Sequence, residues 1–126
     1  MTSIKELLIT GNDIPFVESK ASFSKVLSVI ASKRLGCALV KDKKFNRISI
    51  VTDGDTARAA SKFRNISSLK VSEFMNKNPK YINENTLATE ALSIMNAKRI
   101  TILLVKSKSR FKGLVSLHSI LEYLGK

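Results

Sequence analysis

Ile50-Val51-Thr52-Asp53-Gly54-Asp55 joins an apolar stretch to a hydroxyl residue and an acidic turn. Leu114-Val115-Ser116 repeats the apolar stretch and its hydroxyl end 64 residues later. Each stretch follows another apolar run, at 37–40 in one case and 100–105 in the other, and each is preceded further back by a helix-like segment. Two copies of one unit predict a compact domain with internal pseudo-two-fold symmetry.

The copies also predict how the chain is organised. Pro15 opens the first copy and Pro79 the second, and seven residues after each proline stands a hydroxyl residue, Ser22 or Thr86, that we expect to cap a helix. The expected spacing between copies is 64 residues, changes to 65 inside the first helix and returns to 64 after the central hairpin. We expect one module over residues 1–126, with a first repeat at about 14–64, a connector at 65–77 and a second repeat at about 78–124. A cleft between two such repeats is where we expect a ligand to bind.

Each copy predicts the element order β-α-β-β-α. A short extended piece precedes a helix with apolar residues at helical spacing, two apolar strands flank a basic turn, and another helix closes the unit. Short apolar strands that alternate with helices indicate an α/β (α+β) fold in which helices pack on sheets. The residues that we expect in the core are Val26, Leu27, Ile30, Leu92 and Met95.

The charge of the chain is strongly positive. Its 126 residues include 22 Lys and Arg against 10 Asp and Glu, a formal net charge of +12. Such an excess suits nucleic acid, a membrane surface or an anionic ligand. The basic residues gather at 41–47 and 106–112, between apolar strands, which is typical of solvated hairpin turns. A DNA-binding protein more often places its charge on a helix or among stacking aromatic residues. We therefore expect no nucleic acid and no membrane partner, and a basic nucleic-acid- or membrane-surface-binding protein is the alternative function.

The single cysteine, Cys37, lies in an apolar run and has no partner for an internal disulfide, which favours a reducing compartment and a buried structural thiol. No stretch reaches the apolar length that crosses a membrane, and the first nine residues lack the features of a signal peptide. We expect a soluble cytoplasmic protein.

Two motifs resemble those of a known family. The strand that runs into Thr-x-x-Asp and a helix at 50–55, together with the segment 71–79, is similar to a tandem pair of cystathionine-β-synthase (CBS) domains, the Bateman module. The resemblance covers essentially the whole chain. The segments 5–15, 33–37 and 117–119 look like the C-terminal CBS pair of bacterial D-arabinose-5-phosphate isomerases.

The resemblance implies a regulatory role. In that family an N-terminal sugar-isomerase (SIS) domain interconverts ribulose 5-phosphate and arabinose 5-phosphate, for synthesis of Kdo and lipopolysaccharide. These 126 residues hold no such domain. We therefore expect a non-catalytic regulatory and oligomerisation module that forms a homodimer and acts on the SIS domain of the same or a parent protein. A purely structural dimerisation domain is a further alternative.

The candidate ligand-binding residues centre on the Thr-x-x-Asp turn. A hydroxyl at a strand end, followed by backbone N–H groups at a helix start, suits phosphate oxygens, and Gly54 lets the backbone approach closely. The resemblance implies that Thr52 faces phosphate and that Asp55 accepts hydrogen bonds from the vicinal hydroxyls of a ribose. The other interpretation is that Asp53 or Asp55 caps the helix and Thr52 ends a strand. The full set of candidates is Ile14, Pro15, Leu35, Gly36, Thr52, Asp53, Gly54, Asp55, Ser116, His118 and Ser119.

The second copy departs from the motif. Ser119 stands where the ribose-binding carboxylate is expected and Leu117 replaces a polar neighbour, so we expect at most one tight nucleotide site per chain. His118, the only histidine, has no cysteine or carboxylate at metal-ligand spacing and no nucleophilic serine paired with it. We expect no catalytic residue, no metal and no required cofactor. The expected effector is AMP, ADP or ATP, or a cytidine sugar nucleotide.

Overall fold

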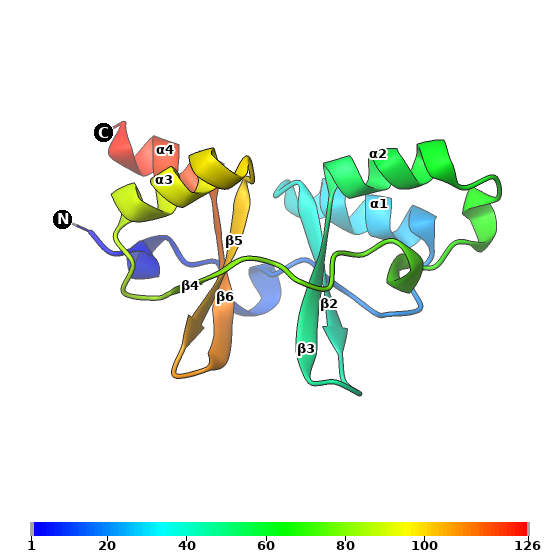
Figure 1. The fold of residues 1–126 in the computed structure, drawn as a ribbon, viewed down its shortest axis with the longest axis horizontal. Coiled ribbons are helices and arrows are strands. Elements are labelled where there is room, and N and C mark those ends of the chain that lie inside the picture. Colours follow the sequence, from blue (N-terminus) through cyan, green and yellow to red (C-terminus); the bar gives the residue numbers. More distant parts are fainter. Residues whose placement is uncertain (1, 126) are drawn as a thin grey trace. The chain divides into compact units, whose positions relative to one another are not determined.

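The structure is a computed structural model that describes residues 2–125, and these residues form two compact units (Figure 1). The first-repeat unit consists of residues 14–79. The second-repeat unit consists of residues 80–125 together with the N-terminal residues 2–13. Each unit has a three-stranded sheet and two α-helices, so the expected α/β fold is confirmed.

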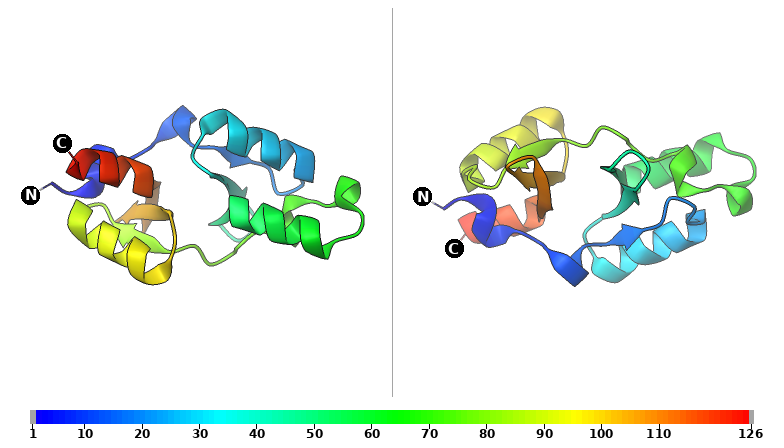
Figure 2. Two further views of the ribbon diagram at one scale, coloured as in Figure 1. Left: turned by 90° about the horizontal axis from the view of Figure 1, so that it is seen from above. Right: turned by 90° about the horizontal axis from the view of Figure 1, so that it is seen from below.

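In the first-repeat unit, the sheet order is β1-β2-β3. β1 (Phe16–Val17) is parallel to β2 (Cys37–Asp42), which is antiparallel to β3 (Arg47–Thr52). The helices α1 (Phe23–Lys33) and α2 (Asp53–Lys62) lie next to each other, as Figure 2 shows. One side of the sheet packs on α1: its Ala38, Val40 and Val51 form one buried cluster with Val26 and Ile30 of that helix.

The second-repeat unit repeats this plan with the sheet order β4-β5-β6. β4 (Tyr81–Asn83) is parallel to β5 (Ile102–Ser107), and β5 is antiparallel to β6 (Arg110–Ser116). Its helices are α3 (Ala88–Lys98) and α4 (Leu117–Leu124). Their core is aliphatic, with Met95 of α3 and Ile120 of α4 in contact with the buried strand residues.

The N-terminal residues complete the second-repeat unit. The 3-10 helix η1 (Ile4–Leu7) places Ile4 fully buried in the same core as Met95 and Ile120. Two residues after that helix, Ile9 exchanges both backbone hydrogen bonds with Leu114 of β6, at 2.8 and 3.1 Å.

The segment that follows α2 is bound to the first-repeat unit. It contains the short 3-10 helices η3 (Ile66–Ser68) and η4 (Val71–Glu73), with Leu69 buried between them. Asn76 then exchanges backbone hydrogen bonds of 2.8 and 2.9 Å with Ile50, two residues before the end of β3.

The expected spacing between the copies is wrong by one residue from the first strand to the start of the first helix, where 64 was expected. Phe16 pairs with Leu39 and Tyr81 with Leu104, so the spacing is already 65 at the first strand. The extra residue lies between Pro79 and β4, because β1 begins directly after Pro15. The return to 64 comes from the second hairpin, which has a shorter turn and a register shift after Val105.

Two further expectations are wrong. Ser22 caps α1 as expected, with its hydroxyl accepting the Lys25 N–H, but the residue at the N-cap of α3 is Leu87 and not Thr86, as the spacing of 65 requires. Leu27 is 42% exposed because α1 meets the sheet through Val26 and Ile30, and Leu27 lies beside that stripe. The other expected core residues, Val26, Ile30 and Met95, are buried, and Leu92 is partly buried against the core.

Candidate functional site

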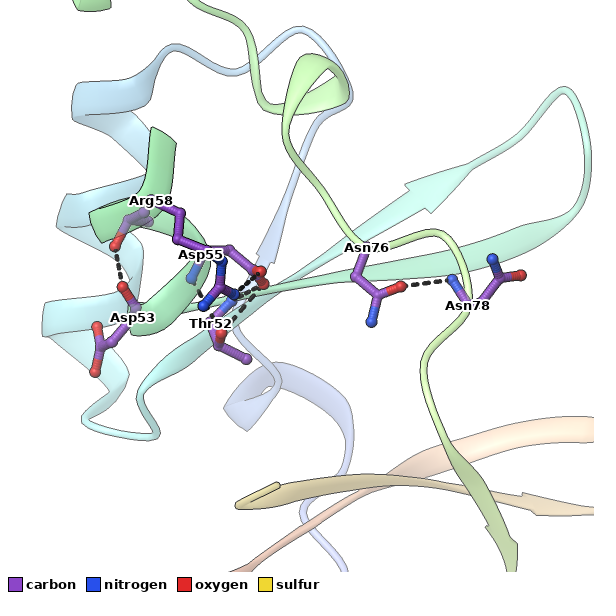
Figure 3. Close-up of polar contacts among 7 residues, drawn as sticks. Thr52, Asp53, Asp55, Arg58, Asn76 and Asn78 are labelled. Atoms are coloured by element: carbon purple, nitrogen blue, oxygen red, sulfur yellow. Dashed lines mark hydrogen bonds and ion pairs between the residues drawn. The ribbon is translucent and has the colours of Figure 1, made fainter. Parts of the chain in front are cut away.

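The Thr52–Asp55 turn begins α2 as a capping box (Figure 3). The Thr52 hydroxyl accepts the Asp55 N–H at 3.3 Å. The Asp55 carboxylate accepts the Thr52 N–H at 2.9 Å and the Thr52 hydroxyl at 3.1 Å, both through Oδ2. Such reciprocal bonds satisfy N–H groups that the first turn of a helix leaves unpaired. The capping role weighed for Asp55 in the sequence is therefore present.

Arg58 holds the other oxygen of Asp55. Its guanidinium nitrogen lies 2.6 Å from Asp55 Oδ1, one helical turn further along α2. The Arg58 side chain is 74% exposed, whereas that of Asp55 is 18% exposed. One oxygen of the carboxylate is thus held by the helix start and the other by an exposed cation. Oδ2 accepts both bonds from Thr52, whereas Oδ1 accepts from Arg58.

The loop before β2 contacts the same turn. The Asp53 N–H donates to the carbonyl oxygen of Gly36 at 3.1 Å. Gly36 has φ +71°, and a Cβ there would lie 3.3 Å from Asp53 Oδ2, so a larger residue would be strained and crowded. The next residue, Cys37, is fully buried, and burial, followed by the charge of Asp53, raises the pKa of its thiol to about 12. The Cys37 thiol is therefore protonated at neutral pH, as expected of a structural cysteine.

The strand register brings the remaining first-repeat candidates to this end of the sheet. Cys37 pairs with Thr52, and Phe16 pairs with Leu39. Ile14, two residues before Phe16, is therefore level with Cys37 and Thr52. The carbonyl oxygen of Pro15 accepts the Leu39 N–H at 2.9 Å. Ile14, Pro15, Leu35, Gly36 and the turn 52–55 thus meet at one edge of the first-repeat unit.

The corresponding turn of the second-repeat unit has hydroxyl groups only. The Ser116 hydroxyl accepts the Ser119 N–H at 3.1 Å, and the two side-chain oxygens lie 3.0 Å apart. The Leu117 N–H donates to the carbonyl oxygen of Thr101 at 2.8 Å, as Asp53 does to Gly36. The His118 side chain is 89% exposed and lies 3.5 Å from the Glu122 carboxylate, one turn further along α4, so the expectation that no carboxylate stands at such a spacing from His118 is wrong. This turn caps its helix without a carboxylate.

Sequence reasoning missed Arg58, Asn76 and Asn78. Arg58 stands three residues after Asp55, a spacing at which opposite charges meet on a helix, so the signal was available. Asn76 pairs with β3 close to Thr52, and its side-chain oxygen accepts the Asn78 N–H at 2.9 Å (Figure 3). The position of Asn76 depends on its pairing with Ile50, more than twenty residues earlier, and no local sequence pattern predicts that pairing.

Across residues 2–125, His, Cys, Asp and Glu side chains form no group of three or more that could hold a metal ion. Of the helices in that range, none has the length and apolarity needed to cross a membrane.

Comparison with known proteins gives the following similarities. The family model "CBS domain" matches residues 71–126. An uncharacterized protein of Rickettsia prowazekii is 37% identical over 122 residues, which is 97% of this chain and 38% of that protein. Arabinose 5-phosphate isomerase KdsD of Yersinia pestis is 31% identical over 119 residues, which is 94% of this chain and 36% of the enzyme. The chain thus spans little more than a third of the length of these relatives.

Solved structures show the same fold. A CBS-domain containing protein, ATU1752 from Agrobacterium tumefaciens, superposes with a TM-score of 0.84 at 20% identity, over 98% of this chain and 99% of that one. The CBS domain pair of protein MJ0100, in complex with 5′-methylthioadenosine and S-adenosyl-L-methionine, has a TM-score of 0.82 at 18% identity, over 99% of this chain and 97% of that one.

Proposed function

Because this chain is a pair of CBS domains, a regulatory and non-catalytic type of domain, we propose that it binds an adenosine-type nucleotide at the Thr52–Asp55 turn and thereby regulates the protein to which it belongs. The observation that carries the proposal is the Asp55 carboxylate, which the capping box fixes at a helix start with Oδ1 turned to an exposed arginine. A cytidine sugar nucleotide is the second ligand that this turn suits.

The turn offers complementary groups to both ends of a nucleotide. The vicinal hydroxyls of a ribose donate to Asp55 Oδ1, and hydrogen bonds to a charged group are the stronger kind. The phosphate lies at the start of α2, where the N–H groups and the helix dipole favour negative charge, within reach of the Thr52 hydroxyl and Arg58. The adenosine ligands of the MJ0100 domain pair support an effector that contains adenosine.

The parent protein that we propose is an arabinose-5-phosphate isomerase or a close relative. The similarity to KdsD over 94% of this chain supports this assignment. The SIS sugar-isomerase domain would carry the reaction of Kdo and lipopolysaccharide synthesis, and the domain pair would sense the nucleotide. A ligand that binds one arrangement of the pair more tightly shifts the population towards it, and the attached enzyme follows.

We further propose that the chain forms a homodimer through its helices. Leu27 on α1 and Leu121 on α4 are 42% and 51% exposed, and Leu124 on α4 is 39% exposed. A groove of about 610 Å³ between α3 and α4 is lined by Leu92, Leu117 and Leu121. A second copy would cover these residues. Light scattering that gives a monomer at high protein concentration would contradict this part of the proposal.

The deciding experiment is a thermal-shift screen of adenine and cytidine nucleotides, followed by calorimetry with each ligand found. A ligand at a hundred times its dissociation constant stabilises the folded state by about 2.7 kcal/mol. For a domain of this size the midpoint should rise by roughly 5–15 °C. Because Ser119 supplies no carboxylate, we expect one tight site per chain. Two equal sites would refute the assignment to Asp55, and no response to any nucleotide would favour a purely structural role.

A further inference from the structure

A basic groove lies on the first-repeat unit, away from the Thr52–Asp55 turn. It has a volume of about 450 Å³ and is bounded by β1, the start of α1 and the end of β2. Its apolar part consists of Phe16, Val17 and Ala21, and Phe16 is 40% exposed. Gly36 and Thr52 lie at the beginning of β2, whereas this groove lies at its other end, where the strand closes with Asp42.

The groove collects positive charge. Lys20, Lys25, Lys41 and Lys43 line it, against the single carboxylate of Glu18. None of the four lysines takes part in an ion pair within residues 2–125. Like charges that share a concave surface repel each other and raise the local concentration of anions. Such a groove is therefore complementary to a ligand that carries more than one negative charge.

The start of α1 adds to this field. Ser22 caps that helix by accepting the Lys25 N–H at 3.1 Å, and Ala21 and Lys25 on either side of the cap both line the groove. The helix has eleven residues, so its positive end is fully developed. Lysine is an unfavourable residue in a first helical turn, where a carboxylate would interact better with the dipole. Lys25 therefore destabilises the start of α1 and adds positive charge to the groove.

The second-repeat unit provides an internal comparison. At the spacing of 65 that strand pairing establishes, Asn85 replaces Lys20 and Glu90 replaces Lys25. Glu90 accepts the Leu87 N–H at 3.4 Å, a capping contact that suits its position. Lys106, the counterpart of Lys41, lies over the Tyr81 ring, 5.5 Å from its centroid. The fold therefore does not require lysines at positions 20 and 25, whereas Lys41 and Lys43 have lysine counterparts in Lys106 and Lys108. Lys20 and Lys25 are the residues that distinguish the first-repeat groove.

We propose that this groove is a second ligand site that binds a small organic phosphate, with the phosphate among the four lysines and an apolar or aromatic body on Phe16 and Val17. Its volume lies in the range of small-molecule sites, and an apolar lining with a few convergent polar groups is their usual composition. The groove shares no residue with the Thr52–Asp55 turn, so this proposal does not depend on the proposed function.

The test is a titration of the 15N-labelled chain with 1-naphthyl phosphate and, separately, with inorganic phosphate. NMR spectra of the amide groups report the binding of each probe. We expect 1-naphthyl phosphate to shift the amide resonances of residues 16–25 and 41–43. It should bind at least about tenfold more tightly than inorganic phosphate, because only the aryl ester covers the apolar part of the groove. No shift at about 10 mM probe, or shifts centred on residues 52–58, would overturn the proposal.

Two charge-matched variants separate the groove from general attraction. The double variant Lys20→Asn, Lys25→Glu copies the second-repeat residues. Its affinity for 1-naphthyl phosphate should be at least about tenfold lower. Lys108→Asn with Lys112→Glu removes the same charge from the β5–β6 hairpin and should change binding less than about twofold. Circular dichroism melts check that both variants fold. An equal loss of affinity for 1-naphthyl phosphate in the two variants would overturn the proposal. Binding of phosphatidylserine vesicles without binding of 1-naphthyl phosphate would also overturn it.

Discussion

Asp55 caps α2 and is the proposed ribose ligand, and a substitution can separate these two roles. Asp55→Ser copies Ser119, whose hydroxyl serves the equivalent turn, so the folded state should lose only about 1 kcal/mol of cap and ion-pair stabilisation. Nucleotide affinity should fall at least tenfold, because hydrogen bonds to an ionised group contribute about 1.5–3 kcal/mol each. Calorimetry measures the affinity and urea unfolding the stability.

Ser119→Ala is the matched control for Asp55→Ser. It removes a hydroxyl from the turn that has no carboxylate, and it should leave nucleotide affinity nearly unchanged. Tight binding that survives Asp55→Ser would refute the assignment of the ribose to this carboxylate.

Cys37 makes stability depend on pH in the alkaline range. Burial, followed by the charge of Asp53, raises its pKa from the ordinary value of 9.0 to about 12 in the folded protein, so above pH 9 the unfolded chain has lost a proton that the folded chain keeps. The free energy of unfolding should therefore fall between pH 9 and pH 12, by about 1.4 kcal/mol per pH unit from this residue. Cys37→Ala should flatten the curve of urea-derived stability against pH over this interval. Equal slopes in the two proteins would contradict the burial of a neutral thiol.

At the level of elements, sequence periodicity was sufficient for the strands and helices but not for their register. Apolar spacing and turn residues predicted β-α-β-β-α in both copies. The two prolines suggested a spacing of 64, yet Pro79 stands one residue further from its strand than Pro15 does. Only hydrogen-bonded pairing fixes such a shift, and the displaced cap at Thr86 follows from it.

The candidate site was predictable to the extent that it is local. Thr52, Asp55 and Arg58 all lie within seven consecutive residues, and the structure brings these three side chains together. The contribution of Gly36 and Asn76 depends on strand pairing across the unit, and the exposure of Leu27 depends on which part of α1 meets the sheet. Neither follows from a short stretch of sequence.

The pairing of the N-terminal segment with β6 depends on one glycine. A Cβ at Gly113 would lie 2.2 Å from the carbonyl oxygen of Ile9, and φ is +157°. Gly113→Ala should therefore separate Ile9 from Leu114 and lower the free energy of unfolding by about 2 kcal/mol, since a partly buried pair of backbone hydrogen bonds is lost. Hydrogen exchange of the Ile9 amide and urea unfolding measure the two effects.

Gly11→Ala is the control for Gly113→Ala. Gly11 also has a positive φ, of +59°, but no atom lies within 4 Å of an added Cβ, so only conformational strain of about 1 kcal/mol is expected. A loss at Gly113 no larger than that at Gly11 would show that the N-terminal segment is not held by β6.

At the scale of the whole molecule, the net charge of +12 has to be reconciled with a nucleotide-binding role. Lysines and arginines of the two hairpins are exposed, and Lys44 and Arg47 lie over the exposed ring of Phe45, 5.5 and 4.8 Å from its centroid. A surface of this kind attracts any polyanion at low salt, and attraction alone does not identify a physiological partner.

The salt dependence of affinity distinguishes DNA binding from nucleotide binding. A protein that neutralises 6–10 phosphates of duplex DNA loses about 10³–10⁵ in affinity between 50 and 200 mM salt, because each contact releases condensed counterions. A mononucleotide has no such counterion layer, and its hydrogen bonds to Asp55 and Thr52 are not screened, so its affinity should fall less than about tenfold over the same interval. Fluorescence anisotropy with labelled duplex DNA and a labelled adenosine nucleotide measures both slopes. DNA binding that stays tight at 200 mM salt, with nucleotide binding absent, would assign the positive surface to nucleic acid and remove the regulatory proposal.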